Sequence, residues 1–212
     1  MLEAKSLAFS YGRKVVWGGV DLSLAGGKIV FLRGVNGSGK STLLRCLAGR
    51  LRPREEEVRF LGKPIFAPAR RDLAGLSLVP DVPAFYDDLT GSEHLQHVSC
   101  FNGHKEVEER GLALAGEFHM ADALDVLPSA LSWGMRYKLA LVLVLATHPQ
   151  VLLLDEPFAP IDANADLVLG RKLGSLAADG SAVLLSVHGD VAALKATYTL
   201  RLDGGFLYGE SC

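Results

Sequence analysis

Short runs of β-branched residues and leucine recur along the chain, separated by glycine and aspartate, in a pattern typical of strands. The runs are Val20–Leu24, Ile29–Leu32, Val58–Leu61, Leu76–Val79, Val151–Leu154, Ala182–Val187 and Thr199–Leu202. Several are separated by segments long enough for helices, which are Ser41–Gly49, Ala163–Ala178 and Val191–Ala196. This alternation predicts an α/β fold with a mostly parallel sheet.

The two ends of the chain and its middle depart from this alternation. No helix-length segment intervenes between Leu2 and Leu32, so we expect an N-terminal antiparallel β layer, and Asp203-Gly204-Gly205 predicts a hairpin near the C-terminus. The stretch from about Thr90 to His148 lacks strand signals. It predicts a helical insertion with helices at Gly91–Phe101, Lys105–His119 and Trp133–Thr147.

Composition argues against a nucleic-acid-binding protein and against a membrane-spanning one. The chain has 212 residues, and its 22 Lys and Arg against 24 Asp and Glu give a net charge of −2. It therefore lacks the global positive field that holds proteins on nucleic acid or anionic membranes. The longest apolar run, Leu139–Ala146, is far shorter than a membrane span. Without a signal-peptide pattern at the start, we expect the protein in the cytosol.

Three cysteines, Cys46, Cys100 and Cys212, are scattered without CxxC spacing, which indicates neither a disulfide framework nor a zinc site.

A phosphate-binding motif follows directly after the apolar run Ile29–Leu32. The sequence Gly34-Val35-Asn36-Gly37-Ser38-Gly39-Lys40-Ser41-Thr42 fits the pattern G-x-x-x-x-G-K-[ST]. The glycines let backbone N–H groups turn toward phosphate oxygens, and the following helix adds its partial positive charge. We expect Lys40 to hold the β- and γ-phosphates of a nucleotide, the Ser41 hydroxyl to ligate Mg²⁺, and Thr42 to contact phosphate.

A second candidate site is Val151-Leu152-Leu153-Leu154-Asp155-Glu156, a buried strand that ends in two carboxylates. Asp155 is placed to hold Mg²⁺ directly or through water. Glu156 is placed to orient or deprotonate a water that attacks the γ-phosphate. A strand that ends in Asp-Glu is a weak signal alone, because turns often begin with Asp, and it gains weight from the phosphate loop.

These residues, together with further landmarks in the right order, resemble the nucleotide-binding subunit of ATP-binding cassette (ABC) transporters over almost the whole chain. Leu131-Ser132-Trp133-Gly134-Met135 stands where that family has its Leu-Ser-Gly-Gly-Gln signature, 23 residues before Asp155 for Ser132. Tyr11 resembles the aromatic residue that stacks on adenine, Asp162 the aspartate of the D-loop, and His188 the switch histidine.

The resemblance implies a P-loop NTPase (RecA-like) core within a single domain over residues 1–212. The core is expected at about 1–84 and 149–212, with a helical subdomain at about 85–148. It also implies ATP and Mg²⁺ as ligands and a head-to-tail dimer of cassettes, homomeric or heteromeric, in which Ser132 at the start of one helix faces the partner's nucleotide.

Three positions depart from the family pattern. Asp81 stands where the family has a glutamine that touches Mg²⁺, and its shorter side chain and negative charge alter reach and electrostatics. Trp133 replaces the first signature glycine and Met135 the glutamine, a pattern that resembles simple exporter subunits. The segment Val82–His97 occupies the region that in the family faces the membrane subunit, although Phe85 and Tyr86 are equally consistent with packing of the insertion onto the core.

Three functional hypotheses remain open from the sequence. The first is an ATPase subunit that drives export through a separate integral membrane permease, at the inner face of the cell membrane and without nucleic acid as partner. The second is a non-transport cassette ATPase that acts on nucleic acid or ribosomes. The third is a weakly active or regulatory nucleotide-binding half of a heterodimer, which Asp81 and Trp133 motivate.

Overall fold

The computed structural model describes residues 1–54, 58–66, 73–103 and 106–210. Its strands form two sheets, one of six strands in the order β10-β9-β3-β8-β7-β6 and one of four in the order β2-β1-β4-β5. The strands are β1 (Leu2–Tyr11), β2 (Lys14–Leu24), β3 (Ile29–Arg33), β4 (Val58–Phe60), β5 (Lys63–Pro64), β6 (Leu76–Val79), β7 (Val151–Asp155), β8 (Ala182–Ser186), β9 (Tyr198–Asp203) and β10 (Phe206–Glu210).

The six-stranded sheet is parallel except at one edge, as the alternation predicts. Strands β9, β3, β8, β7 and β6 run parallel, and β10 pairs with β9 in the antiparallel sense through the predicted hairpin. All five residues of β7 and of β8 are buried, because helices or strands cover both faces of the sheet. The carboxyl ends of β3, β7 and β8 therefore meet at one edge.

The four-stranded sheet is the predicted antiparallel layer, in which β1 pairs with both β2 and β4. The expected extent of this layer, Leu2 to Leu32, is wrong at its end. Ile29–Arg33 forms β3 in the middle of the parallel sheet, because its first four residues are all buried and suit a two-sided position better than a half-exposed layer.

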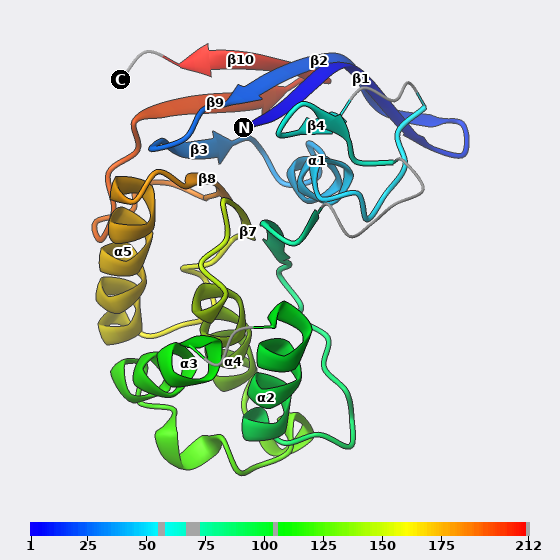
Figure 1. Ribbon diagram of the computed structural model, residues 1–212. Coiled ribbons are helices and arrows are strands. Elements are labelled where there is room, and N and C mark those ends of the chain that lie inside the picture. The colour runs from blue at the N-terminus through cyan, green and yellow to red at the C-terminus, as the bar shows by residue number, and fades with distance from the viewer. Residues whose placement is uncertain (55–57, 67–72, 104–105, 211–212) are drawn as a thin grey trace.

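Five α-helices lie in the described part of the chain, with two short 3₁₀ turns between α3 and α4. They are α1 (Lys40–Leu47), α2 (Gly91–Asn102), α3 (Glu106–Glu117), the 3₁₀ turns η2 (Ala121–Ala123) and η3 (Pro128–Ala130), α4 (Trp133–Ala146) and α5 (Ala163–Ala178). Helices α2, α3 and α4 lie together below the sheet in Figure 1. Lys105 and Cys212, which the sequence interpretation included, lie outside the described residues.

The predicted helix at Val191–Ala196 is wrong, since this segment forms turns and extended chain. Six residues give too few hydrogen bonds to offset helix nucleation. The segment is also held in close backbone contact with α5, where a Cβ atom on Gly170 would lie 2.1 Å from the Ala193 carbonyl oxygen.

Two hydrophobic clusters lie on opposite faces of the parallel sheet. Ile29 and Phe31 of β3 belong to a cluster with α4, α5 and the inner sides of α2 and α3. Val30 and Leu32 belong to a second cluster, with α1 and the antiparallel layer. Figure 1 shows α1 and α5 on different sides of the sheet, with the antiparallel layer above α1. None of the helices in the described ranges is both long and apolar enough to cross a membrane.

Candidate functional site

The phosphate-loop motif lies between the end of β3 and the start of α1, as the sequence predicts. Gly37 and Gly39 have left-handed backbone angles, with φ of 79° and 100°, which glycine adopts without strain. Space is also restricted, because a Cβ atom on Gly34 would lie 2.4 Å from the Leu202 carbonyl oxygen. The glycines therefore allow a tight turn that presses the backbone against β9 and β2.

Lys40, the first residue of α1, is 5% exposed and points back into the loop. Its ammonium group donates hydrogen bonds to the carbonyl oxygens of Gly34 (2.9 Å) and Val35 (3.4 Å). Within the described ranges no carboxylate forms an ion pair with Lys40. A buried ammonium group that has only carbonyl partners favours an anionic ligand such as phosphate.

A cleft of about 490 Å³ opens over this loop. Tyr11 stands at its rim, half exposed, and its hydroxyl lies 3.4 Å from Thr42 Oγ1. The lining residues are Tyr11, Lys14, Val15, Val16, Asn36, Gly37, Gly39, Lys40, Ser41, Thr42, Glu156 and His188. The cleft thus brings together an aromatic ring, the phosphate loop, an acid and a histidine from four separate parts of the chain.

Asp155 ends β7 and is 1% exposed. Burial raises the pKa of its carboxyl, and hydrogen bonds from the Ser186 and Ser41 hydroxyls act in the opposite direction. Ser186 Oγ donates to Asp155 Oδ1 at 2.7 Å, and the hydroxyl of Tyr137 donates to the Asp155 carbonyl oxygen at 3.1 Å. A buried carboxylate beside the Ser41 hydroxyl supplies the oxygen ligands that Mg²⁺ prefers.

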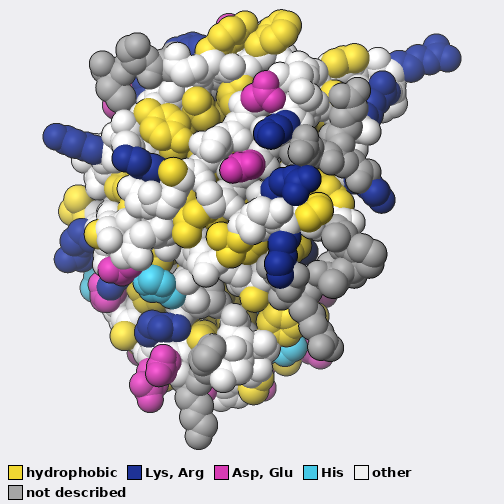
Figure 2. Space-filling view, turned by 45° about the horizontal axis from the view of Figure 1, so that its top comes forward, with side chains coloured by type: hydrophobic (Ala, Val, Ile, Leu, Met, Phe, Trp, Pro, Cys, Tyr) yellow, Lys and Arg dark blue, Asp and Glu magenta, His cyan; other side chains and the backbone are white. Residues whose placement is uncertain are grey.

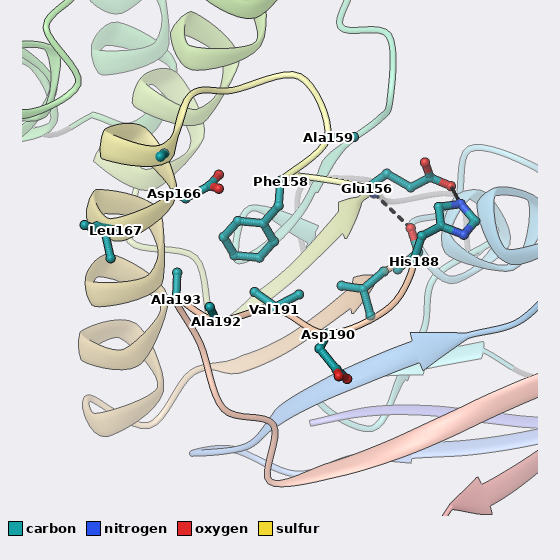
Figure 3. Close-up of a pocket in the computed structure, with 13 residues that line it drawn as sticks. Glu156, Phe158, Ala159, Asp166, Leu167, His188, Asp190, Val191, Ala192 and Ala193 are labelled. Carbon is teal, nitrogen blue, oxygen red and sulfur yellow. Dashed lines mark hydrogen bonds and ion pairs between the residues drawn. The ribbon is translucent and has the colours of Figure 1, made fainter.

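Glu156, the next residue, has a left-handed backbone with φ of 51°, which is uncommon for a residue with a side chain. Its N–H donates to Ser186 Oγ at 2.9 Å, and its Oε1 lies 2.5 Å from His188 Nε2. Figure 3 shows the two side chains pointing toward each other at the edge of a pocket. Backbone strain of this kind persists where the surrounding structure fixes it, often at functional sites.

The pocket in Figure 3, about 540 Å³ in volume, adjoins the cleft and shares Glu156 and His188 with it. Its other walls come from α5 and from the segment after β8, including Phe158 and Val191. It is mostly apolar. Asp166 enters it from α5, and burial raises the pKa of this carboxyl.

Asp81 follows β6 and interacts with α1. Its Oδ1 lies 3.4 Å from Arg45 Nη2, with both side chains about half exposed. It is also close enough to raise the pKa of Asp155 by charge repulsion. The structure thus places the expected metal ligand Asp81 near Asp155, where it is paired with Arg45.

Ser132, Gly134 and Asp162 do not line the cleft. Ser132 is the N-cap of α4, where its hydroxyl accepts a hydrogen bond from the Met135 N–H at 3.3 Å. Gly134 packs closely, since a Cβ atom there would lie 2.6 Å from the Pro160 carbonyl oxygen. Asp162 is the N-cap of α5.

Sequence reasoning did not assign a role to Ser186, which lies between the two acidic residues Asp155 and Glu156. Its hydroxyl links Asp155 to the backbone of Glu156. The available signal was its position at the end of a buried strand, which the structure pairs in register with Asp155.

The expected Mg²⁺ site is judged by the side-chain oxygen atoms that could serve as its ligands. The described residues contain no group of three or more His, Cys, Asp or Glu side chains that could hold a metal ion by themselves. Ser41 and Asp155 provide a hydroxyl and a carboxylate beside the phosphate loop, which fits an ion completed by phosphate oxygens and water.

A phosphate loop after β3, with two acids at the end of β7 in the same parallel sheet and only β8 between them, defines a P-loop nucleotide-binding protein. The chain belongs to the ABC transporter family, whose model matches residues 17–159. The protein is accordingly an ABC-type ATPase with a P-loop NTPase fold, as the resemblance implies.

Relatives and solved structures agree with this membership. The chain is 31% identical over 206 residues to the cytochrome c biogenesis ATP-binding export protein CcmA of Cupriavidus pinatubonensis, which covers 94% of this chain and 91% of the relative. The ATP-binding subunit of an ABC transporter superposes with a TM-score of 0.92 at 28% identity, over 100% of this chain and 90% of the other. A dimeric cassette bound to ADP and phosphate has the same fold, with a TM-score of 0.85 at 21% identity over 100% of this chain and 98% of the other.

Proposed function

We propose that this chain is the ATP-binding and ATP-hydrolysing subunit of an export-type transporter, and that it drives transport through a separate integral membrane permease. The observation that carries the proposal is the cleft in which Lys40 of the phosphate loop, Glu156 and His188 meet. A buried cation for phosphate and an acid held by a histidine are the groups that nucleotide hydrolysis requires.

In this proposal the nucleotide lies along the cleft, with adenine against Tyr11 and its phosphates on the loop. Lys40 exchanges its bonds to the Gly34 and Val35 carbonyls for bonds to phosphate oxygens. Further contacts come from the other residues of the loop, which are Gly34, Asn36, Gly37, Ser38, Gly39, Ser41 and Thr42. A loop built from glycine lets the backbone approach phosphate closely.

Ser41 and Asp155 would hold Mg²⁺, and Asp81 would be a further ligand if its carboxylate were free of Arg45. Held there, Mg²⁺ would supply positive charge that stabilises the phosphate groups. Asp155 serves this purpose because Ser186 and Ser41 hold its carboxylate in place.

Glu156 accepts a proton from the attacking water as the water oxygen bonds to the γ-phosphorus. The bond between that phosphorus and the bridging oxygen breaks, which gives ADP and phosphate. His188 orients the Glu156 carboxylate through the 2.5 Å contact and lies beside the γ-phosphate position.

A second cassette completes the site. Ser132, Gly134 and Asp162 lie away from the cleft of their own chain, and the N-terminus of α4 has backbone N–H groups that can donate hydrogen bonds to a phosphate oxygen. The cassette bound to ADP and phosphate is a dimer. We infer a head-to-tail dimer, with an identical or a related chain, that forms when ATP is bound.

The permease proposal rests on the family and on one exposed surface. CcmA is named as an export protein. In the segment before α2, Phe85 packs against the core, whereas Val82 and Tyr86 are 67% and 59% exposed. The exposed pair is available for a membrane subunit, which would place the protein at the inner face of the cell membrane. On the face that Figure 2 shows, Lys and Arg side chains lie among hydrophobic, uncharged and acidic ones. The net charge of −2 favours a protein partner over nucleic acid.

One alternative has a specific observation in its favour. Asp81 and Trp133 both depart from the family pattern and favour a weakly active half of a heterodimer. In the structure Asp81 is paired with Arg45, and Trp133 is exposed beside Ser132.

ATP turnover by purified protein with Mg²⁺ tests these proposals, together with ATP-dependent dimerisation of Glu156→Gln followed by light scattering. We expect turnover that the variant loses and a dimer that ATP traps. The matched control is Asp122→Asn, an exposed acid of η2 that lies away from the cleft. If Glu156→Gln turned over ATP like the unchanged protein, the catalytic role of Glu156 would be refuted. If neither turnover nor a dimer appeared, the heterodimer alternative would replace the first proposal. Copurification with an integral membrane protein tests the permease.

A further inference from the structure

Trp17 of β2 lies directly against the phosphate loop and is 1% exposed. A Cβ atom on Gly39 would lie 2.9 Å from both Cδ1 and Nε1 of the indole. The edge of the ring that carries the N–H therefore fills the space beside Gly39, the residue that immediately precedes α1.

The indole N–H is buried and makes no hydrogen bond within the described ranges. The hydroxyl of Ser38, one residue before Gly39, is also buried without a partner there. Buried donors without acceptors are rare and costly, and each one in a folded protein requires an explanation. Because both groups lie beside the Ser38-Gly39 turn, a second arrangement of this turn that gives them partners would explain both.

Lys40 provides a reason for such a second arrangement. Its ammonium group now holds the Gly34 and Val35 carbonyl oxygens, which span the start of the loop. A bound phosphate competes for that ammonium group, so the two carbonyls are released and the turn between them and α1 adjusts. Gly37 and Gly39, both left-handed, are the residues that can change backbone angles most readily.

We propose that Trp17 is a positioning residue for phosphate binding. Its ring sets the position of the turn from Gly37 to Lys40, and its N–H gains an acceptor from that turn when phosphate is bound. This inference rests on the proposed function, because it requires that phosphate groups bind to this loop.

Nucleotide binding could also change the surroundings of Trp17 by a second route, through aromatic contacts on the adenine side of the cleft. Phe9 contacts Tyr11 with ring centroids 4.9 Å apart, and it contacts Trp17 at 5.9 Å. Adenine stacked on Tyr11 could therefore alter the surroundings of Trp17 through Phe9, without any change in the phosphate loop.

Tryptophan fluorescence tests the proposal, because Trp17 and Trp133 are the two tryptophans of the chain. In the Trp133→Phe variant the emission reports on Trp17 alone. The probes are inorganic pyrophosphate, ADP and adenosine, each with Mg²⁺. Equilibrium dialysis of radiolabelled ADP measures binding independently. We expect pyrophosphate and ADP to change the Trp17 emission and adenosine to leave it unchanged.

A second variant, Trp17→Phe in the Trp133→Phe background, keeps an aromatic ring and removes the N–H. We expect ADP to bind roughly three- to tenfold more weakly than to Trp133→Phe, the effect of losing one hydrogen bond, while the urea unfolding midpoint shows that the variant is folded.

Failure of the Trp17 proposal and failure of nucleotide binding give different results. Emission that responds to adenosine but not to pyrophosphate would assign the signal to the Phe9 route and overturn the inference. The same conclusion follows if ADP binds by dialysis while the Trp17 emission is constant. If dialysis shows no ADP binding to the unchanged protein, the proposed function itself fails, and the inference fails with it.

Discussion

His188 Nε2 lies 2.5 Å from Glu156 Oε1, although the two residues are 32 positions apart and follow different strands. Strands β7 and β8 are adjacent and parallel, so the residues that follow them emerge at the same edge of the sheet. Ser186 links the backbone of Glu156 to β8, because its hydroxyl accepts from the Glu156 N–H. The contact therefore depends on strand pairing as well as on the two side chains.

Replacement of His188 by alanine is expected to lower kcat for ATP hydrolysis about 100-fold, because Glu156, which accepts the proton, loses the group that orients it. The KM for ATP is expected to change less, because Lys40 and the loop remain. Steady-state kinetics measures both. His97→Ala, an exposed histidine of α2, is the control and should keep the original kcat. A kcat for His188→Ala within twofold of the original value would contradict the role assigned to this contact.

Substitutions of Asp81 and Arg45 are expected to change the Mg²⁺ requirement of ATP turnover in opposite directions. If Asp81 reaches the ion, then Asp81→Ala removes a ligand and should raise the Mg²⁺ concentration for half-maximal turnover several-fold. Arg45→Ala frees the carboxylate from its 3.4 Å partner and should lower that concentration. Titration of turnover with Mg²⁺ measures both variants. Equal Mg²⁺ requirements in Asp81→Ala and the unchanged protein would restrict Asp81 to the ion pair.

The lowered pKa of Asp162 is expected to make the stability of the fold depend on pH. Hydrogen bonds from the Lys138 ammonium group and the Ala165 N–H lower the pKa of this carboxyl to about 2, below its value of about 3.9 in an unfolded chain. The unfolded state thus binds the proton more tightly, so the carboxylate stabilises the fold above about pH 4, and this contribution is lost as the pH falls toward 2.

Asp162→Ala is accordingly expected to lower the free energy of unfolding by about 1 kcal/mol near neutral pH, the usual effect of losing an N-cap. The side chain is more than half exposed, so the ion pair adds little to this figure. Urea unfolding at several pH values measures the difference, which should shrink between pH 4 and 2. Asp162→Asn keeps a cap acceptor and should lose less. A difference that is constant down to pH 2 would show that the charge of Asp162 contributes nothing.

Local sequence patterns predicted the features that depend on consecutive residues. The runs at Ile29–Leu32 and Val151–Leu154 are strands because their residues are buried on both faces, and periodicity reports such burial directly. The phosphate loop is one continuous motif, so its place between β3 and α1 follows from the sequence.

Features that depend on pairing across the fold could not be predicted in the same way. The Arg45 contact with Asp81 and the two hydrogen bonds of Ser186 join residues whose proximity arises only when β6, β7 and β8 are assembled around α1. The turns at Val191–Ala196 have the same origin. Their alanines and leucine favour a helix locally, and tertiary contact with α5 overrides that preference.

Gly170 of α5 carries that contact, and Gly174 one turn later provides a matched control. A Cβ atom on Gly170 would lie 2.1 Å from the Ala193 carbonyl oxygen, whereas a Cβ atom on Gly174 meets nothing within 4 Å. Gly170→Ala should therefore lower the free energy of unfolding by about 1–3 kcal/mol, since backbone must move to admit the methyl group. Gly174→Ala should raise it by about 0.5–1 kcal/mol, because alanine favours a helix more than glycine does. Urea unfolding of the two variants measures the contrast. Equal effects of the two substitutions would show that the segment after β8 is not held against α5 as the structure describes.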